Sequence, residues 1–190
     1  DRLDELKEAY AFGAEESYGM LLPPKLRDKD GVTAALVVAE MAGHFKARGM
    51  TLFEAVDALM ARVGTFHNRL VNLEDPRPGG AKRFAEAMER IRTAGLASLG
   101  GEKVVSWEDF QTGLWHGEGR SEAILDRPDN RAVALPIPRS NVLKFRLESG
   151  AFAAFRPSGT EPKLKVYLQS RTDAALMDRL EAEARSLLGL

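Results

Sequence analysis

Residues 156–165 read Arg-Pro-Ser-Gly-Thr-Glu-Pro-Lys-Leu-Lys, and the sequence on either side predicts strands that meet at this stretch. Upstream, residues 141–147 alternate apolar and charged side chains, a Ser-Gly turn follows, and residues 151–155 can return as a second strand. Downstream, residues 164–169 again show the two-residue period of a half-buried strand. We therefore expect a loop between two strands of a small antiparallel sheet.

The residues of this loop favour anion binding. An arginine guanidinium matches two phosphate oxygens, the hydroxyls can donate hydrogen bonds, and the lysines add positive charge. Glycine permits backbone conformations closed to other residues, and successive amides can form a concave anion site. The same residue types are common in exposed turns, so residue chemistry alone does not distinguish a phosphate-binding loop from a polar hairpin turn. The candidate anion-binding residues are Arg156, Ser158, Gly159, Thr160 and Lys165, with Lys163 as a further cation.

A second polar segment lies near the start of the chain. Residues 12–19 read Phe-Gly-Ala-Glu-Glu-Ser-Tyr-Gly, and residues 27–32 read Arg-Asp-Lys-Asp-Gly-Val. The Glu15 carboxylate can accept hydrogen bonds from two neighbouring hydroxyls, and the Ser17 hydroxyl can donate or accept, so the pair suits a diol. The alternative is that the acids cap the following helix or bind a backbone amide, and that the charges around Lys29 form weak local ion pairs.

Both segments resemble motifs of one enzyme family. Residues 156–163, preceded by residues 140–145, are similar to the C-terminal phosphate-binding segment of the α-D-phosphohexomutases, the phosphoglucomutase and phosphomannomutase superfamily. Residues 12–19 and 27–32 are similar to its sugar-recognition loop and the charged turn after it. The resemblance follows the same order and spacing from about residue 9 to the C-terminus, so the chain is identified as a C-terminal fragment of such an enzyme.

The resemblance implies a function for the whole enzyme. Phosphohexomutases move a phosphoryl group between the 1- and 6-hydroxyls of a hexose through a phosphoserine and a bisphosphorylated intermediate, with Mg²⁺. The candidates of the loop at residues 156–165 would hold the phosphate, and Glu15, Ser17 and Lys29 would contact the sugar. Ala14 departs from the larger residue or glycine that related sequences carry, and we expect altered packing there rather than a lost contact.

The catalytic parts of the family pattern are missing from the sequence. It contains neither the Thr-Ala-Ser-His-Asn-Pro phosphoserine stretch nor an Asp-Gly-Asp metal loop, so we expect no catalytic residue, no metal ligand and no mutase activity in this chain alone. Its expected partners are hexose phosphates and the enzyme's own N-terminal domains. Two alternatives from other classes are a stand-alone, non-enzymatic phosphate-binding module and a structural α+β domain. The sequence does not reveal which sugar phosphate binds.

The resemblance also predicts the fold. Residues 1–75 would be the C-terminal part of the α/β sugar-binding third domain, and residues 76–190 an α+β fourth domain whose small antiparallel sheet is flanked by helices. The Asp-Pro-Arg-Pro-Gly-Gly run at residues 75–80 favours a boundary there.

Periodicity predicts the individual elements. Asp30 is a plausible N-cap for a helix that stops near Gly49, and Thr51 and Glu54 match a capping box that opens a second helix. On that second helix we expect the apolar side to be buried. Further along the chain we expect a helix at 81–94, a strand at 103–107, a loop or a poorly ordered insert at 112–130 and a helix at 173–188. The apolar residues of the second helix are Phe53, Val56, Leu59, Met60 and Val63.

Composition narrows the class of partner. The 190 residues include 44% hydrophobic and 29% charged residues, which is ordinary for a soluble globular protein. A net charge of −1 provides no basic field for nucleic acid or an anionic membrane. The chain has no cysteine, and its three histidines lack the paired spacing of a zinc helix, so we expect helix-surface or loop positions for them. No long uncharged apolar run occurs, and the expected location is cytoplasmic.

Overall fold

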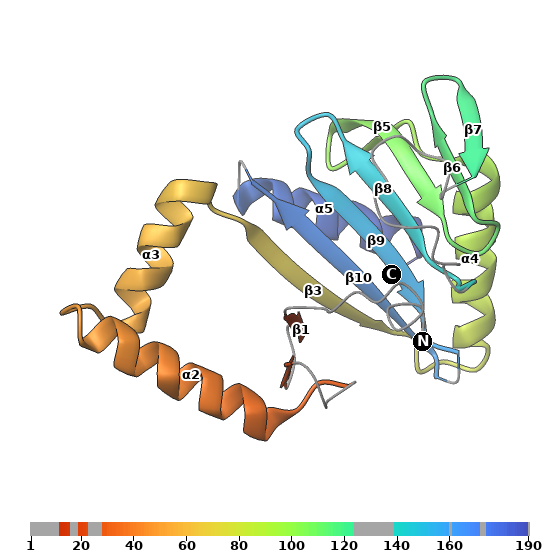
Figure 1. The fold of residues 1–190 in the computed structure, drawn as a ribbon. Helices are drawn as coiled ribbons and strands as arrows, with labels where there is room; N and C mark the ends of the chain where they lie inside the picture. Colours follow the sequence, from red (N-terminus) through yellow and green to blue (C-terminus); the bar gives the residue numbers. More distant parts are fainter. Residues whose placement is uncertain are drawn as a thin grey trace. The chain divides into compact units, whose positions relative to one another are not determined.

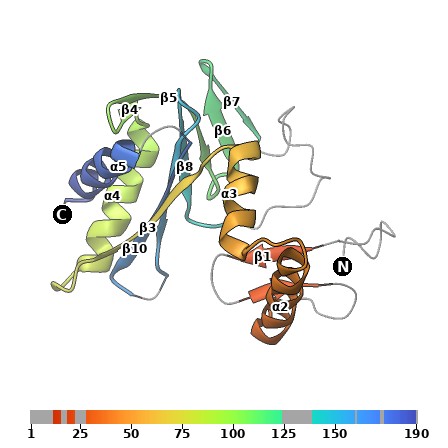
Figure 2. The ribbon, with the colours of Figure 1, turned by 90° about the vertical axis from the view of Figure 1, so that its left-hand side faces the viewer.

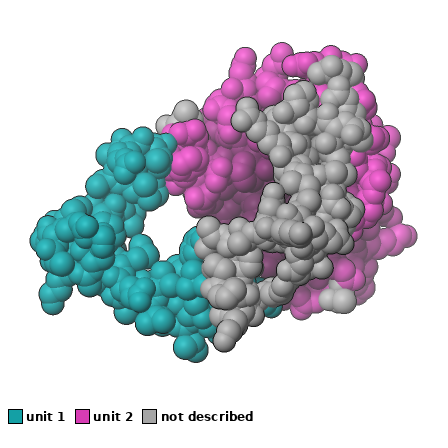
Figure 3. Space-filling model, in the orientation of Figure 1, with its two compact units in different colours: residues 1–64 teal, residues 65–190 magenta. Residues whose placement is uncertain are grey.

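The computed structural model of the protein divides into two compact units. Residues 1–64 form the first and residues 65–190 the second, and Figure 3 shows them in different colours. Each unit has its own sheet and its own helices. The structure describes residues 12–15, 19–22, 28–123, 139–159, 161–171 and 174–189.

The described strands of the second unit form an eight-stranded antiparallel sheet. The strand order is β3-β10-β9-β8-β5-β6-β7, and the short β4 pairs with β5 beside this path. The expected hairpin is present, because β9 and β10 are adjacent and antiparallel. The strands are β3 (His67–Glu74), β4 (Ser98–Leu99), β5 (Glu102–Asp109), β6 (Leu114–Gly117), β7 (Arg120–Ala123), β8 (Leu143–Leu147), β9 (Phe152–Pro157) and β10 (Lys163–Ser170).

Two helices of the described part of this unit, α4 (Gly80–Ala94) and α5 (Ala174–Leu187), lie on the same face of the sheet (Figure 1). Figure 2 shows this arrangement edge-on, with the opposite face of the sheet free of helices from this unit. The expected α+β fold with an antiparallel sheet is therefore confirmed, with both helices on one side of the sheet.

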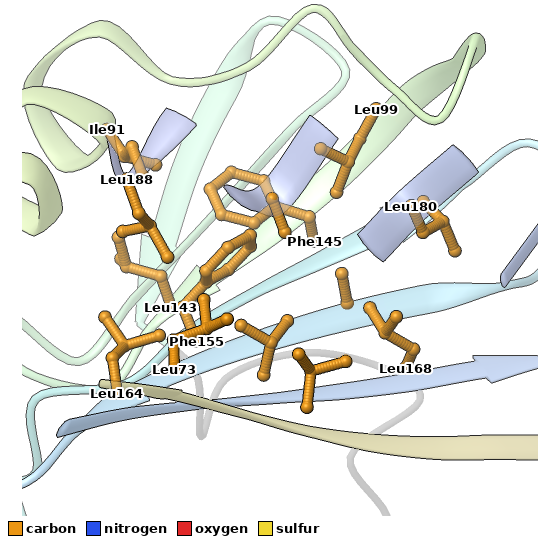
Figure 4. Close-up of a cluster of buried hydrophobic side chains, with 14 of the residues drawn as sticks. Leu73, Ile91, Leu99, Leu143, Phe145, Phe155, Leu164, Leu168, Leu180 and Leu188 are labelled. Carbon is orange, nitrogen blue, oxygen red and sulfur yellow. The ribbon is translucent and has the colours of Figure 1, made fainter. Parts of the chain in front are cut away.

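The core of the second unit lies between the sheet and these helices. On β10, Leu164, Val166 and Leu168 are buried, whereas Lys165 between them is exposed, as the alternation of a strand requires. Figure 4 shows Phe145 among the leucines of the sheet and helices. Burying one large apolar side chain contributes about 1.5–3 kcal/mol. The apolar residues of β10 therefore fix which of its faces meets the helices and which is left open.

The helices supply matching apolar stripes. On α4, Phe84, Met88 and Ile91 are buried at helical spacing, and on α5 Leu176 and Leu180 are buried. The predictions of helices at 81–94 and 173–188 agree with these two elements to within one residue at each end. Both helices are thus held to the sheet by the stripe that the sequence shows.

The first unit contains a two-stranded sheet and two helices among its described residues. β1 (Gly13–Glu15) pairs with β2 (Gly19–Leu21), and α2 (Gly31–Lys46) and α3 (Leu52–Val63) follow. The Asp30 carboxylate accepts from the Thr33 amide at 2.6 Å and caps α2. Thr51 and Glu54 form both hydrogen bonds of a capping box at the start of α3. Both predicted helix starts are confirmed.

The predicted burial of the apolar side of α3 is wrong. No residue of α2 or α3 is buried, and Phe53 is 85% exposed. An amphipathic pattern indicates that a helix has an apolar side, but that side becomes buried only where another segment packs against it. The part of the first unit that the structure describes offers the two helices each other and β2, and no larger sheet. The exposed apolar side chains of α3 are Phe53, Val56, Leu59 and Val63.

The domain boundary expected at residue 75 differs from the division of the structure after Gly64. The difference is β3, because its eight residues pair with β10 along its whole length and so belong to the second unit's sheet. The proline and glycine residues that suggested a boundary instead form the turn between β3 and α4.

The expected loop at residues 112–130 contains a β-hairpin in its described part. β6 and β7 pair through the two-residue turn Glu118-Gly119. Both turn residues have positive φ, 52° and 74°, as the common two-residue hairpin turn requires. Glutamate rather than asparagine at the first position made this turn hard to recognise in the sequence.

The histidines lie partly where they were not expected. His44 is on the exposed surface of α2, as predicted, but His67 and His116 lie in strands. The His116 ring stacks on Trp107 with ring centroids 3.9 Å apart, and its Nδ1 is 2.8 Å from Oγ of Ser121. Partial burial lowers the pKa of His116. These contacts make His116 a packing residue of the β5–β6–β7 region.

Candidate functional site

The loop between β9 and β10 is stabilised by hydrogen bonds within itself. The Ser158 amide donates to the Lys163 carbonyl at 2.8 Å, and the Glu161 amide donates to Oγ of Ser158 at 3.2 Å. The first bond continues the antiparallel ladder of the two strands into the loop. The base of the loop is therefore set by the register of β9 on β10, while the candidate residue Thr160 lies outside the described residues.

Gly159 is exposed, and its φ does not lie in the left-handed region. The expectation that glycine serves here to adopt a conformation closed to other residues is therefore not what the structure shows. A Cβ atom built on Gly159 would have no heavy atom within 4 Å. What glycine provides is open space beside the main chain, where a ligand can approach the amides.

Three polar side chains form a row across the open face of the sheet. Arg156 on β9 is the cross-strand partner of Lys165 on β10, and Lys165 is the partner of Asn72 on β3. Neighbouring strands lie about 4.8 Å apart, so the row spans about 10 Å from Arg156 to Asn72. Phe155, Leu164 and Val166 beside them are buried, as are Val71 and Leu73 on either side of Asn72, which leaves the three polar side chains on the opposite face.

The positive charges in this region differ in their pairing. Nζ of Lys163 lies 3.3 Å from Glu161 and 3.5 Å from Glu74. Its hydrogen bond to Glu161, with the nearby Glu74 charge, raises the pKa of Lys163. Arg156 and Lys165 are exposed and form no ion pair or side-chain hydrogen bond with the described residues. The uncompensated cations beside the loop are therefore Arg156 and Lys165 rather than Lys163.

A cavity of about 290 Å³ brings these groups together. Most of its polar groups are donors or cations, because the Arg156 guanidinium, the Lys165 ammonium group and the Gly159 amide donate hydrogen bonds or carry positive charge. The acidic group in its lining, Glu161, is already paired with Lys163. Such a lining favours a small anion over a neutral or cationic ligand. The lining residues are Asn72, Arg156, Pro157, Ser158, Gly159, Glu161, Lys163 and Lys165.

The loop is also anchored from the side by Asp75. The Asp75 amide donates to the carbonyl of Pro162 at 3.0 Å. Its buried carboxylate accepts from Nε and Nη2 of Arg77, at 2.7 and 2.9 Å, and from Nε of Arg83 at 2.7 Å. Hydrogen bonds from Arg77 and then Arg83 hold the pKa of Asp75 well below its usual range. The prolines and paired glycines of this segment indicated a domain boundary, so the role of Asp75 was not predictable from the sequence pattern.

The remaining candidates belong to the first unit. Glu15 is the last residue of β1 and pairs with Gly19 of β2, while Ser17 lies outside the described residues. Lys29 is exposed; its Nζ lies 3.6 Å from the Asp28 carboxylate, and its amide donates to the same carboxylate at 2.8 Å. Arg156, Ser158, Gly159 and Lys165 are thus brought together in the second unit, and Glu15 and Lys29 are in the first.

The structure contains no group of three or more His, Cys, Asp or Glu side chains that could hold a metal ion, within the ranges it describes. In the same ranges, no helix is both long and apolar enough to cross a membrane.

Comparison with known proteins agrees with the two-unit division. Residues 70–187 match the family "Phosphoglucomutase/phosphomannomutase, C-terminal domain", and residues 2–63 match "Phosphoglucomutase/phosphomannomutase, alpha/beta/alpha domain III". Curated relatives include the phosphoglucomutases of Staphylococcus epidermidis, 30% identical over 167 residues, and of Staphylococcus haemolyticus, 31% identical over 169 residues.

These alignments cover most of this chain but a small share of the relatives. They include 88% and 87% of this chain, against 29% and 28% of the two phosphoglucomutases. The chain thus spans less than a third of the length of these relatives. Both domain matches occur in the order in which the sequence motifs predicted them. The chain belongs to the phosphoglucomutase/phosphomannomutase family.

Proposed function

We propose that this chain binds a hexose phosphate as the C-terminal part of a phosphohexomutase. The whole enzyme would move a phosphoryl group between the C1 and C6 oxygens of the sugar, through a phosphoserine and a bisphosphate intermediate. One observation carries the binding proposal: two uncompensated cations, Arg156 and Lys165, lie in register on the cavity whose loop has open space at Gly159.

The proposed roles follow from the chemistry of each group. Arg156 would bind two phosphate oxygens with its planar fork, and Lys165 would add a point charge from the neighbouring strand. Ser158 and the amide of Gly159 would donate to the remaining oxygens, and Thr160 would complete the loop's donors. Phosphoryl transfer depends on positioning and on charge stabilisation, and these groups would supply positioning at the non-reacting phosphate.

The sugar would be held by the first unit in the same proposal. Glu15, Ser17 and Lys29 would contact its hydroxyls. These contacts would allow the sugar to bind in either of its two orientations. Mg²⁺ would act elsewhere in the enzyme, because the Asp-Gly-Asp metal loop of the family pattern is not in this sequence. A sugar bisphosphate would serve as intermediate and activator of the whole enzyme.

The test is an NMR titration of the chain with glucose 1-phosphate, following the amide resonances of Ser158 and Gly159. We expect these resonances to shift and to saturate. The Arg156→Ala variant should raise the dissociation constant at least about tenfold, because a hydrogen bond to a charged group contributes about 1.5–3 kcal/mol.

Arg90→Ala is the matched control for charge. Arg90 is exposed on α4, the helix that covers the other face of the sheet. Its removal therefore changes the net charge by as much as Arg156→Ala does, without altering the cavity. We expect its dissociation constant to equal that of the wild type. If Arg156→Ala and Arg90→Ala bind glucose 1-phosphate equally well, the loop is not the phosphate site and the proposal is wrong.

A further inference from the structure

Asn72 is a polar residue of the cavity that the sequence motifs do not include. It lies on β3 between Val71 and Leu73, which are buried, so its own side chain is on the open face. It is the cross-strand partner of Lys165 and lines the same cavity as Arg156. No ion pair or hydrogen bond involves its side chain within the described part of the chain. Asn72 is therefore available to a ligand that occupies the cavity.

Asn72 lies some distance from the loop that would hold the phosphate. Along β3, Asn72 lies two residues, or about 7 Å, from Glu74, which pairs with Lys163 at the base of the loop. Across the sheet it lies two strands, or about 10 Å, from Arg156. The long side chains of Arg156 and Lys165 can reach back toward the loop, but the short side chain of Asn72 stays close to its own strand.

The chemistry of Asn72 also differs from that of its neighbours. Its amide oxygen is a neutral acceptor, and its NH₂ group is a donor. The groups around the loop are donors or cations, so they satisfy phosphate oxygens but leave a ligand hydroxyl without an acceptor. The carboxylates of Glu74 and Glu161 are already paired with Lys163.

We propose that Asn72 is a specificity residue that binds a hydroxyl of the sugar ring, beyond the phosphate, while Arg156 and the loop bind the phosphate itself. This inference rests on the proposed function and deepens it. Together, Arg156, the loop and Asn72 would then bind phosphate monoesters of polyhydroxylated compounds more tightly than simple phosphate monoesters.

The test compares two ligands that carry the same charged group. Glucose 1-phosphate and methyl phosphate are both phosphate monoesters, but methyl phosphate has no hydroxyl. NMR titration of Asn72→Leu should show a dissociation constant for glucose 1-phosphate raised about three- to tenfold, the range for one neutral hydrogen bond, and an unchanged constant for methyl phosphate.

Asn68→Leu is the matched control. Asn68 is on the same strand and the same face, four residues away, and its Oδ1 accepts from Gln169 at 2.8 Å outside the cavity. We expect this variant to bind both ligands like the wild type. Preserved amide dispersion in the spectra of both variants shows that the fold is intact.

Three other outcomes of these titrations would each contradict a different part of the proposal. If Asn72→Leu weakens both ligands equally, Asn72 contacts the phosphate and the assignment to a hydroxyl is wrong. If it weakens neither, Asn72 is not part of the site. If Arg156→Ala, measured in the same series, leaves both ligands unaffected, the proposed function itself fails, and the inference about Asn72 fails with it.

Discussion

At the scale of single residues, the Asp75 carboxylate couples the fold to pH. It is buried and accepts hydrogen bonds from Arg77 and Arg83, which hold its pKa below the ordinary carboxyl value near 4. A carboxyl whose pKa is lowered in the folded state stabilises that state above its unfolded pKa. The contribution is lost as the pH falls through the lowered folded value.

We therefore predict that Asp75→Asn lowers the thermal unfolding midpoint at neutral pH, because the neutral amide cannot compensate two guanidinium groups. The difference from the wild type should shrink as the pH is lowered below about 4, because the Asp75 carboxyl of the unfolded chain becomes protonated there while the folded carboxylate stays ionised. Circular dichroism melting curves at neutral pH and near pH 3 measure both differences.

Asp178→Asn is the control for this prediction. The Asp178 side chain is 73% exposed and pairs with Arg69 at 2.8 Å on the surface. Exposed ion pairs contribute little to stability, so we expect a small effect at either pH. An effect of Asp75→Asn that is the same at both pH values would contradict the role assigned to its charge.

At the scale of elements, α5 is held to the sheet by buried leucines. Leu180 is fully buried, and a Cβ atom added at Gly100 would lie 2.7 Å from its Cδ2, so the β4–β5 turn packs directly on this side chain. Gly100 has a φ of +63°, in the region that favours glycine. The helix and the turn thus fit each other through one close contact.

We predict that Leu180→Ala lowers the free energy of unfolding by about 2–5 kcal/mol, the range for a buried leucine that leaves a cavity. Leu114→Ala on β6 is the control, because this leucine is 37% exposed and its truncation should cost clearly less. Urea unfolding followed by tryptophan fluorescence measures both variants. Equal losses would mean that α5 does not depend on this packing.

The helices of the first unit show which properties of a helix are predictable from its own sequence. The starts of α2 and α3 were predictable because a cap depends on residues only three positions apart. The exposure of Phe53 and its neighbours was not predictable in this way, since burial depends on which other segments are present to cover the helix.

At the scale of the whole molecule, the groups proposed to position a phosphate are Arg156, Lys165 and the loop between β9 and β10. The phosphoserine stretch and the Asp-Gly-Asp metal loop of the family pattern are missing from the sequence. We predict that the isolated chain does not convert glucose 1-phosphate into glucose 6-phosphate, even with Mg²⁺ and glucose 1,6-bisphosphate present. A coupled assay for glucose 6-phosphate measures this.

A full-length relative, such as the phosphoglucomutase of Staphylococcus epidermidis, is the positive control in that assay. The chain should bind glucose 1-phosphate in the NMR titration under the same buffer conditions. Sustained turnover by the purified chain at a rate proportional to its concentration would show that the positioning role is incomplete.

Short-range patterns in the chain were sufficient to predict the local elements and the family. The β9–β10 hairpin, the helices α4 and α5, both helix caps and the two family motifs depend on residues close together in the chain, where periodicity and motif spacing are visible. The pairing of β3 with β10, in contrast, became visible in the three-dimensional arrangement of the sheet. That pairing places Asn72 next to Lys165 and ties Asp75 to Pro162. These residues lie about 90 positions apart in sequence, and the register between distant strands is set by packing of the whole sheet rather than by any local pattern.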